Sequence, residues 1–259
     1  MSIRPTAAQA GASPESREYA FFSQTGDPVI LENAARLGFD FVVVDVQHGP
    51  YSRSALRGQM QAIEVGGARG FVRLSSATGE NVGSALDSGA HGLIAPLVNT
   101  AADAADFAAY AKYPPAGIRS SGVSRRTPLT TRPIGEINDS IELYAMIETE
   151  QGLANVDEIA AVEGITGLYL GPTDLSLAVG GTFAGDPSIA DDFEAAVRRI
   201  LDAARSNRIR AVFHGRNAEM LGSRMEQGFS TGVIASELTL LHAALTENLE
   251  RLRGIGGES

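Results

Sequence analysis

Short β-branched or apolar runs alternate with longer helical patterns along almost the whole of this 259-residue chain. Eight runs have the length and composition of strands, and they cover 18–22, 39–44, 70–74, 92–97, 143–147, 167–170, 209–213 and 231–235. Strands that are separated by helices need crossover connections, which make the sheet parallel. Eight such units predict a single-domain (β/α)₈ barrel, a fold that typically needs about 250 residues. An open doubly wound sheet is the alternative, but no GxGxxG sequence opens a helix to support it.

Alanine-rich helical patterns fill the stretches between the expected strands. They cover 27–37, 54–65, 80–88, 101–112, 151–162, 189–206, 217–227 and 237–252. Two stretches interrupt the alternation, the long Gly-, Ser-, Pro- and Arg-rich segment 113–133 and the shorter segment 180–187. Long loops in compact domains are usually functional or disordered. Because no linker divides the chain, we expect residues 1–18 to be a loosely attached tail and residues 19–259 to form the barrel.

Composition excludes several classes of function. The chain has no cysteine, which rules out disulfides, thiolate metal sites and thiol nucleophiles. Its formal net charge of −10 argues against a nucleic-acid partner, whose phosphates would be repelled. No apolar run approaches the roughly 20 residues of a membrane helix, and the start of the chain lacks the apolar stretch of a signal peptide. We therefore expect a cytoplasmic protein without a membrane partner, with a degenerate transit peptide at the start as the alternative.

The chain contains a single lysine, Lys112. It ends the helical pattern 101–112, where we expect its amine to be in contact with water. Enzymes that form a Schiff base with a carbonyl substrate need a lysine whose amine is desolvated and neutral, and in a barrel that lysine stands on a strand. Since no expected strand carries one, imine chemistry is excluded.

Polar side chains follow five of the expected strands at the point where each strand ends. In a (β/α)₈ barrel this rim carries the active site, because the loops of all eight strands converge there. The polar residues at these strand ends are Asp45, Gln47, His48, Arg73, Glu148, Thr173, Asp174 and His214. Convergence of acidic, basic and imidazole groups on one rim is more specific than any single motif.

Each of these residues also has a structural explanation when it is taken alone. Asp174 precedes a Leu-Ser-Leu-Ala pattern and could cap a helix. Glu148 could be an acid that stabilises the first turn of a helix. Arg73 could be a surface ion-pair partner, and His48 beside Gly49 could be a turn residue.

At these residues the sequence resembles the class II, metal-dependent pyruvate aldolases typified by 2,4-dihydroxyhept-2-ene-1,7-dioate aldolase and macrophomate synthase. The matching stretches run in family order from about residue 27 to the C-terminal helix. They are GFDFVVVDVQHGPYS, GFVRLSS, ALDSGAHGLIAPLVN, KYPPAGIRS, MIETEQGLANVDEI, EGITGLYLGPTDLSLAVG and GVIASELTLL. The first eighteen residues match no part of the family.

The resemblance implies a metal site. Residues matching Glu148 and Asp174 bind a divalent cation such as Mg²⁺, Mn²⁺ or Co²⁺, which chelates pyruvate and carries its enolate. Backbone N–H groups around Thr173 and Asp174 would hold the pyruvate carboxylate. Two carboxylates with substrate and water oxygens make an all-oxygen octahedral site, which suits a hard cation.

The resemblance also implies roles for the groups around the substrate. The Arg73 counterpart contacts the keto oxygen, where a preorganised donor typically contributes about 3–4 kcal/mol. The His48 counterpart takes part in proton transfer through water, and an acid matching Asp45 or Asp87 orients it. A neutral imidazole near pH 7 can accept a proton and return it, as a reversible aldol reaction requires.

This chain departs from the family at two positions. Many relatives have a glutamate where this chain has Gln47, which keeps a hydrogen-bonding group for the substrate but removes a negative charge near the metal. Period two along the strand places Met146 on the same face as Glu148, where some relatives carry a polar glutamine. Metal affinity and the choice of aldehyde are therefore open.

The remaining histidines differ in what they suggest. Relatives carry an apolar residue at the position of His214, near the aldehyde end of the substrate. The imidazole of His214 would either point into its own loop beside Gly215 or donate to a hydroxyl or carboxylate of the aldehyde. His91 begins the fourth expected strand and His242 lies on the last helical pattern, so we assign both to the structure.

The sequence as a whole predicts reversible retro-aldol cleavage of a 4-hydroxy-2-oxo acid into pyruvate and an aldehyde. Alternatives are oxaloacetate decarboxylation of the macrophomate synthase type and a non-catalytic, anion-binding barrel subunit. A citrate-lyase-like cleavage of a thioester is disfavoured by the Asp-x-Gln-His-Gly-Pro stretch at 45–50. Family resemblance further implies a homohexamer, a trimer of dimers that exchange their C-terminal helices.

Overall fold

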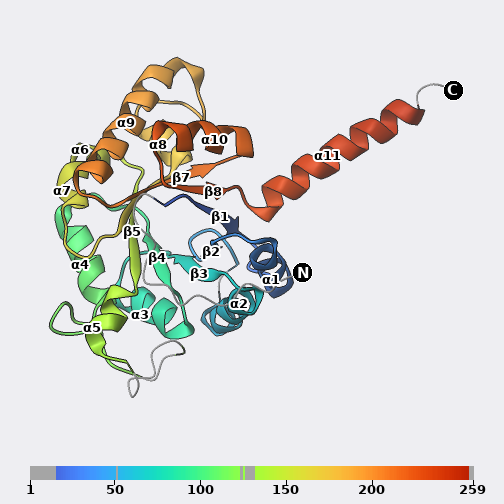
Figure 1. Cartoon of the computed structure of the whole chain (residues 1–259). Helices are drawn as coiled ribbons and strands as arrows, with labels where there is room; N and C mark the ends of the chain where they lie inside the picture. The colour runs from blue at the N-terminus through green and yellow to red at the C-terminus, as the bar shows by residue number, and fades with distance from the viewer. Residues whose placement is uncertain (1–15, 51, 123–124, 126–131, 257–259) are drawn as a thin grey trace.

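The computed structural model describes residues 16–50, 52–122, 125 and 132–256. Its eight strands form one closed barrel in sequence order (Figure 1). They are β1 (Glu18–Ser23), β2 (Phe41–Asp45), β3 (Arg69–Arg73), β4 (Gly92–Ala95), β5 (Glu142–Ile147), β6 (Gly167–Leu170), β7 (Arg210–Gly215) and β8 (Thr231–Ile234). Each expected strand is confirmed, and the expected bounds agree to within two residues.

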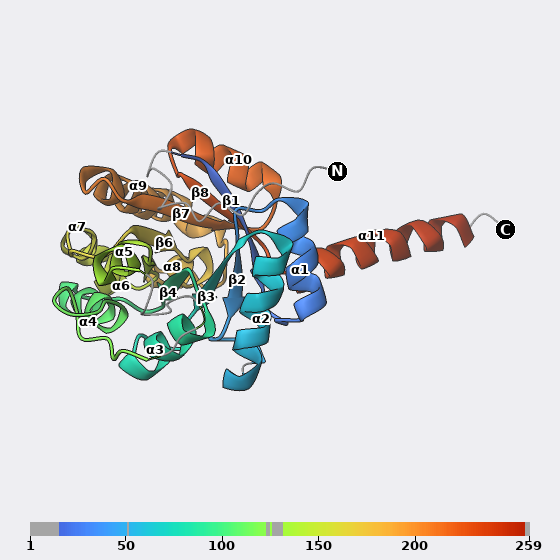
Figure 2. The ribbon, with the colours of Figure 1, turned by 60° about the horizontal axis from the view of Figure 1, so that its bottom comes forward.

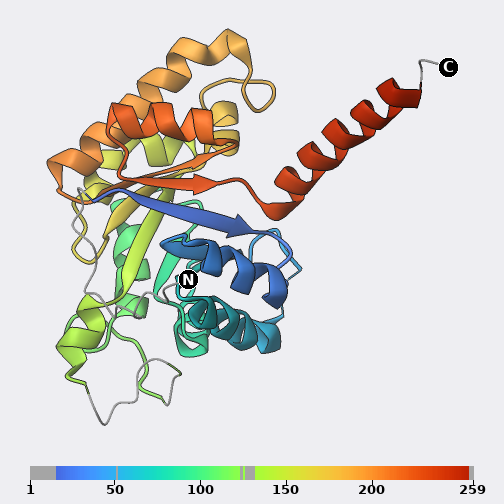
Figure 3. The ribbon, with the colours of Figure 1, turned by 45° about the vertical axis from the view of Figure 1, so that its right-hand side comes forward.

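All eight strand pairs are parallel, and the pairing of β1 with β8 closes the barrel. Figure 3 shows these two strands side by side, although they are the first and the last in the chain. Since every strand runs the same way, the C-terminal ends of all eight meet on one rim. The single-domain (β/α)₈ barrel predicted from the sequence is therefore correct.

The helices cover the outside of the barrel, except α11, which projects away from it (Figure 2). They are α1 (Pro28–Leu37), α2 (Arg53–Gly66), α3 (Gly79–Ser88), α4 (Ala101–Ala111), α5 (Ile134–Asp139), α6 (Glu150–Ala154), α7 (Val156–Ala160), α8 (Pro172–Ala178), η1 (Pro187–Ile189), α9 (Ala190–Ser206), α10 (Ala218–Gln227) and α11 (Glu237–Gly256). The pattern 151–162 is two helices instead of one, because the Asn155 amide turns to donate to the carbonyl of Asn99 at 2.8 Å. Helices α5 and α8 were not predicted, since six or seven residues are too few to show a periodicity.

Two separate layers of apolar side chains hold the barrel together. Alternate strand residues point inward and fill the barrel with aromatic and branched side chains. The other strand residues point outward and pack beneath the helices in the larger core cluster. Aromatic rings are concentrated inside the barrel, where Phe41 and Phe71 lie 4.3 Å apart between ring centroids and Phe71 and Tyr144 lie 5.5 Å apart.

Buried ion pairs close the N-terminal end of the barrel. Arg69 contacts the carboxylates of Glu18, at 2.6 Å, and Glu142. Arg210 lies 3.2 Å from the other oxygen of Glu18. The Tyr144 hydroxyl donates to Glu142 at 2.8 Å. Each of these charged groups therefore has a partner of opposite charge within the same chain.

The expectation that Lys112 is exposed to water is wrong. Lys112 is buried, and its amine donates to the carbonyl oxygens of Asn138 and, at 3.1 Å, Ile141. The chain after α4 turns back, so that the Arg119 N–H donates to the Lys112 carbonyl, while residues around α5 cover the amine. Burial lowers the pKa of Lys112 to about 8. The amine nevertheless lies at the N-terminal end of β5, at the opposite end of the barrel from the rim.

The C-terminal helix α11 leaves the barrel after β8 and projects outward from the rim (Figures 1 and 3). Six of its leucines are exposed, namely Leu238, Leu240, Leu241, Leu245, Leu249 and Leu252. No helix among the described residues combines the length and apolarity that a membrane span requires. Most of the expected tail (residues 1–15) and part of the expected long loop (residues 123–124 and 126–131) lie outside the described residues.

Candidate active site

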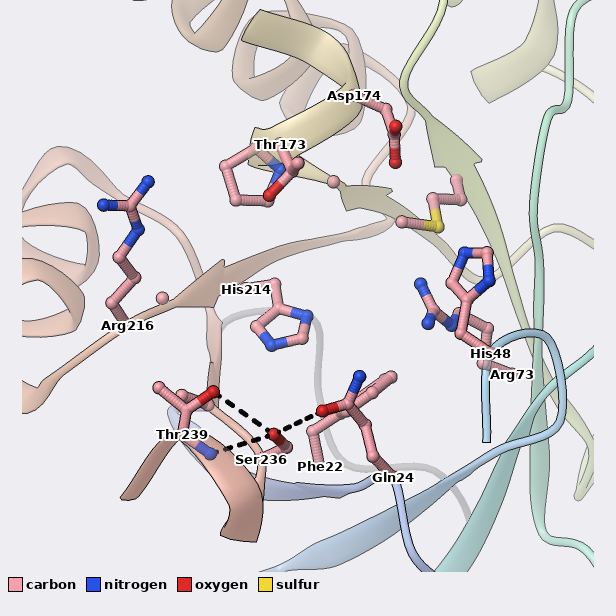
Figure 4. A pocket seen from close by; sticks show the side chains of 15 residues that line it. Phe22, Gln24, His48, Arg73, Thr173, Asp174, His214, Arg216, Ser236 and Thr239 are labelled. Atoms are coloured by element: carbon pink, nitrogen blue, oxygen red, sulfur yellow. Dashed lines mark hydrogen bonds between the residues drawn. The ribbon is translucent and has the colours of Figure 1, made fainter. Parts of the chain in front are cut away.

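A pocket of about 460 Å³ opens at the C-terminal rim of the barrel. Figure 4 shows His214 in its centre, with Arg216 and Thr173 on one side and His48 and Arg73 on the other. Of the residues predicted from the strand ends, five line the pocket: His48, Arg73, Thr173, Asp174 and His214. The assignment of polar residues at strand ends to one rim, called the strand-end rule below, therefore correctly grouped side chains that are far apart in the sequence.

Arg73 is held rigidly beside the pocket by Asp45. Its Nε donates to one carboxylate oxygen at 2.9 Å and one Nη donates to the other at 2.6 Å, in a bidentate pair. The guanidinium also lies 4.9 Å above the ring of Phe22. Both members of the ion pair are buried, so the surface ion-pair explanation for Arg73 is wrong. The N–H groups that Asp45 does not engage are available to a ligand.

The structure does not place either expected acid on the imidazole of His48. Asp45 accepts the backbone N–H groups of Gln47, at 3.0 Å, and His48, at 3.3 Å, and thus shapes the loop rather than the ring. Asp87 lies near the C-terminal end of α3 and accepts from Arg119 at 2.8 Å. In the part of the chain that is described, the imidazole of His48 is exposed and has no hydrogen-bond partner. A role of Asp45 or Asp87 in orienting the ring of His48 stays a prediction.

Glu148 and Asp174 form a pair of carboxylates at the rim. Glu148 is 3% exposed, and one of its oxygens accepts the N–H of Leu97 at 2.8 Å. Burial, with Asp174 adding to it, raises the pKa of Glu148 to about 7 against the lowering effect of the Leu97 bond. Among the described residues neither carboxylate has a cation within ion-pair distance. Two carboxylates that face each other without a basic partner are a place where a cation is stabilising.

The residues around this pair fit a hard divalent cation. Gly171 has no side chain, and a Cβ there would lie 3.0 Å from a Glu148 oxygen and 2.4 Å from the Met146 methyl group. The absence of that atom leaves room beside the carboxylates. Within the described ranges no group of three or more His, Cys, Asp or Glu side chains could hold a metal ion. A cation held by Glu148 and Asp174 would therefore keep open positions for substrate and water oxygens, as catalytic metal sites do.

Helix α8 presents backbone donors to the same place. Its N-cap is Gly171, Pro172 occupies the first helical position, and no side chain caps it. Asp174 thus stands inside the first turn, so its explanation as an N-cap residue is wrong. In the described structure the N–H groups of Thr173 and Asp174 have no protein acceptor, which is the arrangement that the predicted carboxylate contact requires.

His214 reaches the pocket from the end of β7. Its Nδ1 lies 2.9 Å from the Tyr169 hydroxyl, and its ring packs on Phe22 with the centroids 4.7 Å apart. Burial and, to a smaller extent, the positive charge of Arg73 together lower the pKa of His214 to about 4, against the raising effect of Asp45. The imidazole therefore points across the pocket and is neutral near pH 7. The explanation that it turns into its own loop is wrong.

The model of the HpcH/HpaI aldolase/citrate lyase family matches residues 18–238 of this chain. The chain belongs to this family. Within the family the chain is a carbon–carbon lyase of the class II pyruvate aldolase type, and the family typically depends on a divalent metal. The family resemblance read from the sequence is thereby confirmed.

Individual relatives agree with this assignment. The chain is 34% identical over 226 residues to a hydroxypyruvate/pyruvate aldolase of Rhizorhabdus wittichii, which covers 86% of this chain and 89% of the relative. It is 33% identical over 220 residues to the 2-dehydro-3,6-dideoxy-6-sulfogluconate aldolase of Pseudomonas putida, covering 84% of this chain and 85% of the relative. The crystal structure of macrophomate synthase has the same fold, with a TM-score of 0.79 and 24% identity over 93% of this chain and 86% of that chain.

Two positions at which this chain departs from many family members differ in their placement. Met146 lines the pocket beside Gly171, so the predicted face is correct. Gln47 does not line the pocket, and its side-chain oxygen is buried without a hydrogen-bond partner in the described structure. A role of Gln47 in binding substrate stays a prediction.

The sequence analysis did not identify the residues after the first and last strands, which form one wall of the pocket. Ser236 donates to the Gln24 amide oxygen at 2.7 Å, and Thr239 stands beside them (Figure 4). Glu237, the first residue of α11, accepts the N–H groups of Gln24, at 3.0 Å, and Thr25, at 2.7 Å. Burial alone would raise the pKa of Glu237, but these bonds outweigh it and lower the pKa. The strand-end rule would have found Gln24 and Ser236, since both follow strands directly.

Two further residues that line the pocket, Phe22 and Arg216, and the fully buried Tyr169 behind His214 have different origins. Phe22 and Tyr169 are inward-facing strand residues, which a period-two reading of β1 and β6 could have identified. Arg216 lies in the loop after β7, and one of its nitrogens donates to the Ala184 carbonyl at 3.3 Å. Because Arg216 directly follows β7, the search for polar residues at strand ends would have found it as well.

Proposed function

We propose that the protein is a divalent-metal-dependent aldolase that reversibly cleaves a 4-hydroxy-2-oxo acid into pyruvate, or a close analogue such as hydroxypyruvate, and an aldehyde. The observation that carries the proposal is the carboxylate pair Glu148 and Asp174, which lies near Arg73 at the rim but has no cation within ion-pair distance among the described residues. The names of the relatives, which include hydroxypyruvate/pyruvate aldolases, support the same chemistry.

A cation held by Glu148 and Asp174 would supply Lewis-acid polarisation of the 2-oxo group. Arg73 would donate to the keto oxygen, on which negative charge develops when the C3–C4 bond breaks. Because Asp45 already holds the guanidinium in place, little reorganisation is needed during the reaction. The N–H groups of Thr173 and Asp174 would bind the carboxylate of the oxo acid.

His48 would carry the proton. In the cleavage direction a proton leaves the 4-hydroxyl group, through water, for the imidazole; the C3–C4 bonding electrons pass to C3 and the aldehyde departs. The resulting enolate of pyruvate takes a proton at C3. The exposed position of His48 at the mouth of the pocket suits exchange with water.

The most direct test follows the methyl protons of pyruvate by NMR in D₂O. We expect the protein with Mg²⁺ or Mn²⁺ to exchange them for deuterium, and EDTA to abolish the exchange. Arg73→Lys keeps the charge but loses the planar fork, so its exchange rate is expected to fall at least about tenfold. Absence of exchange with every divalent cation tried would overturn the proposal in favour of a binding subunit.

A second test separates the two sources of the enolate. His48→Ala should slow aldol cleavage strongly and leave oxaloacetate decarboxylation largely intact, because loss of CO₂ produces the enolate without a base. Equal loss of both reactions would contradict the role proposed for His48.

Imine chemistry can be tested on the same protein. Borohydride with pyruvate should leave the activity intact, since the only lysine donates to carbonyl oxygens at the opposite end of the barrel. An adduct of pyruvate on Lys112 with loss of activity would refute a metal-dependent mechanism.

We also propose that α11 packs against a second copy of the chain in a homohexamer, working in the reducing cytoplasm that the lack of cysteine suits. Its exposed leucines support a partner on this helix. Replacing Leu241 and Leu245 by glutamate should reduce the mass measured by light scattering. An unchanged mass would mean that assembly does not use this face.

A further inference from the structure

The hydroxyl of Tyr169 is a buried donor with one partner. Tyr169 lies inside the barrel on β6, and its side chain is fully buried. The His214 Nδ1 at 2.9 Å is the only hydrogen-bond partner of this hydroxyl among the described residues. Burial raises the pKa of Tyr169 well above its ordinary value, so the hydroxyl keeps its proton.

This contact determines where the imidazole carries its proton. If Nδ1 carried the hydrogen and donated to the tyrosine oxygen, the hydroxyl hydrogen of Tyr169 would be buried without an acceptor. An unsatisfied buried donor typically costs about 1–3 kcal/mol. With the hydroxyl donating to Nδ1, both groups are satisfied, and the hydrogen of the neutral ring sits on Nε2. The geometry therefore favours the Nε2–H tautomer of His214.

Packing fixes the plane in which this second nitrogen lies. The ring of Phe22 contacts the imidazole at 4.7 Å between centroids and 47° between planes, and the Tyr169 ring stands at 89° to it. The ring of His214 occupies the middle of the pocket (Figure 4). The Nε2–H group is a preorganised donor that needs an acceptor from a ligand or from water.

We propose that Tyr169 is a positioning residue that holds His214 in the Nε2–H tautomer, and that His214 thereby selects aldehydes carrying a hydroxyl or carboxylate oxygen. This inference rests on the proposed aldolase function and names the class of aldehyde that its pocket accepts. A site that donates a hydrogen bond to a substrate group discriminates against analogues without that group, whereas an apolar pocket discriminates weakly. Arg216, on the far side of His214 from Arg73, adds positive charge to the same part of the pocket.

The tautomer can be measured without any activity. In protein labelled with ¹⁵N at histidine, long-range ¹H–¹⁵N spectra near pH 7 distinguish the two neutral forms, and His214→Leu assigns the signal. We expect the Nε2–H form in the wild type and a mixture of both forms in Tyr169→Phe. Tyr144→Phe is the matched control, because it removes another buried hydroxyl inside the barrel, one that donates to Glu142 and not to His214. An Nδ1–H form in the wild type would overturn the inference.

Aldehyde preference is measured in the direction of synthesis, with pyruvate and either glyceraldehyde, 4-oxobutanoate or butanal. For His214→Leu we expect the ratio of kcat/KM for each oxygen-bearing aldehyde to that for butanal to fall about tenfold, which corresponds to loss of one hydrogen bond. Tyr169→Phe should lower the same ratios by a smaller factor, and Tyr144→Phe should leave them unchanged. A fall for 4-oxobutanoate alone would identify a carboxylate as the natural acceptor, and a fall for glyceraldehyde alone would identify a hydroxyl.

Failure of this inference is distinguishable from failure of the proposed function. Metal-dependent deuterium exchange into pyruvate does not involve the aldehyde, so exchange by the wild-type protein tests the aldolase chemistry separately from aldehyde selection. Exchange with unchanged aldehyde ratios would disprove the role of His214 and leave the aldolase intact. Loss of exchange in the wild type would instead disprove the aldolase.

Discussion

The two ends of the barrel hold similar charged groups in opposite conditions. At the N-terminal end, the buried carboxylates of Glu18 and Glu142 are both paired with the partly buried Arg69. At the C-terminal end, Glu148 and Asp174 lie together without a cation within ion-pair distance among the described residues. Charged groups that are paired within the chain, here called the closed network, contribute to stability. The two carboxylates at the rim, here called the open pair, need a bound cation to balance their charge. Both ends carry charged groups, but only the C-terminal end has carboxylates left without an ion-pair partner among the described residues. This difference indicates that the C-terminal rim is the functional end.

The largest change in stability is expected from removing the arginine that the two buried glutamates at the N-terminal end share. Arg69→Met leaves the buried carboxylates of Glu18 and Glu142 without their shared cation, which should lower the free energy of unfolding by about 3–5 kcal/mol. Unfolding in guanidinium chloride measures the change. Arg216→Met, an exposed arginine at the other end, is the control and should change stability by about 0.5 kcal/mol or less. Equal losses of stability in Arg69→Met and Arg216→Met would contradict the proposed difference between the two ends.

Removing an acid from the open pair should act on function and not on folding. Asp174→Asn is expected to slow metal-dependent exchange of pyruvate by about a hundredfold to a thousandfold, the range for loss of one preorganised electrostatic group. Stability of the metal-free protein should stay the same or rise, because repulsion with Glu148 is relieved. A clear loss of stability would instead mean that Asp174 supports α8.

The pH dependence of stability should reveal the buried imidazole at the rim. The pKa of His214 falls from 6.5 when unfolded to about 4 when folded, so between these values the unfolded chain binds a proton that the folded chain does not. Its contribution is fully present above pH 6.5 and is lost as the pH falls toward 4, to a total of about 3 kcal/mol. Wild type should therefore lose more stability than His214→Gln between pH 7 and pH 4.5. Parallel curves for the two proteins would show that His214 is not held neutral.

The smallest effect concerns Arg216, which is exposed and therefore screened by solvent. Arg216→Gln should lower kcat/KM for 4-oxobutanoate by about threefold to tenfold and leave butanal unchanged. Raising the salt concentration should reduce the difference between the two proteins. An equal loss for both aldehydes would assign Arg216 to the shape of the loop, where it bonds to Ala184.

The fold could be read from the sequence because strand and helix periods are local properties. The grouping of polar residues at the rim could be predicted as well, because a parallel barrel places the C-terminal end of every strand on the same side. Asp174 and His214 are forty residues apart and were assigned to one site on this ground alone.

Contacts between side chains of distant segments could not be predicted from the sequence. Lys112 looked exposed because its burial depends on Asn138 and Ile141, which reach it through an irregular segment without periodicity. Asp87 looked like a partner for His48 through family resemblance, yet the end of its helix carries it away from the rim. Period two along β6 could have placed Tyr169 inside the barrel, but its contact with His214 could not be predicted, since that side chain reaches it from the next strand.

Helix α11 is joined to the pocket at its first turn. Its first residue, Glu237, holds the backbone of Gln24 and Thr25, and Ser236 just before it bonds to the Gln24 side chain. Twenty residues of helix extend about 30 Å from this attachment. The helix is thus a lever arm whose pivot is one wall of the pocket. The hydrogen bonds that anchor the helix are therefore the same ones that fix Gln24 and Ser236 in the pocket wall, so the helix and the wall share one attachment.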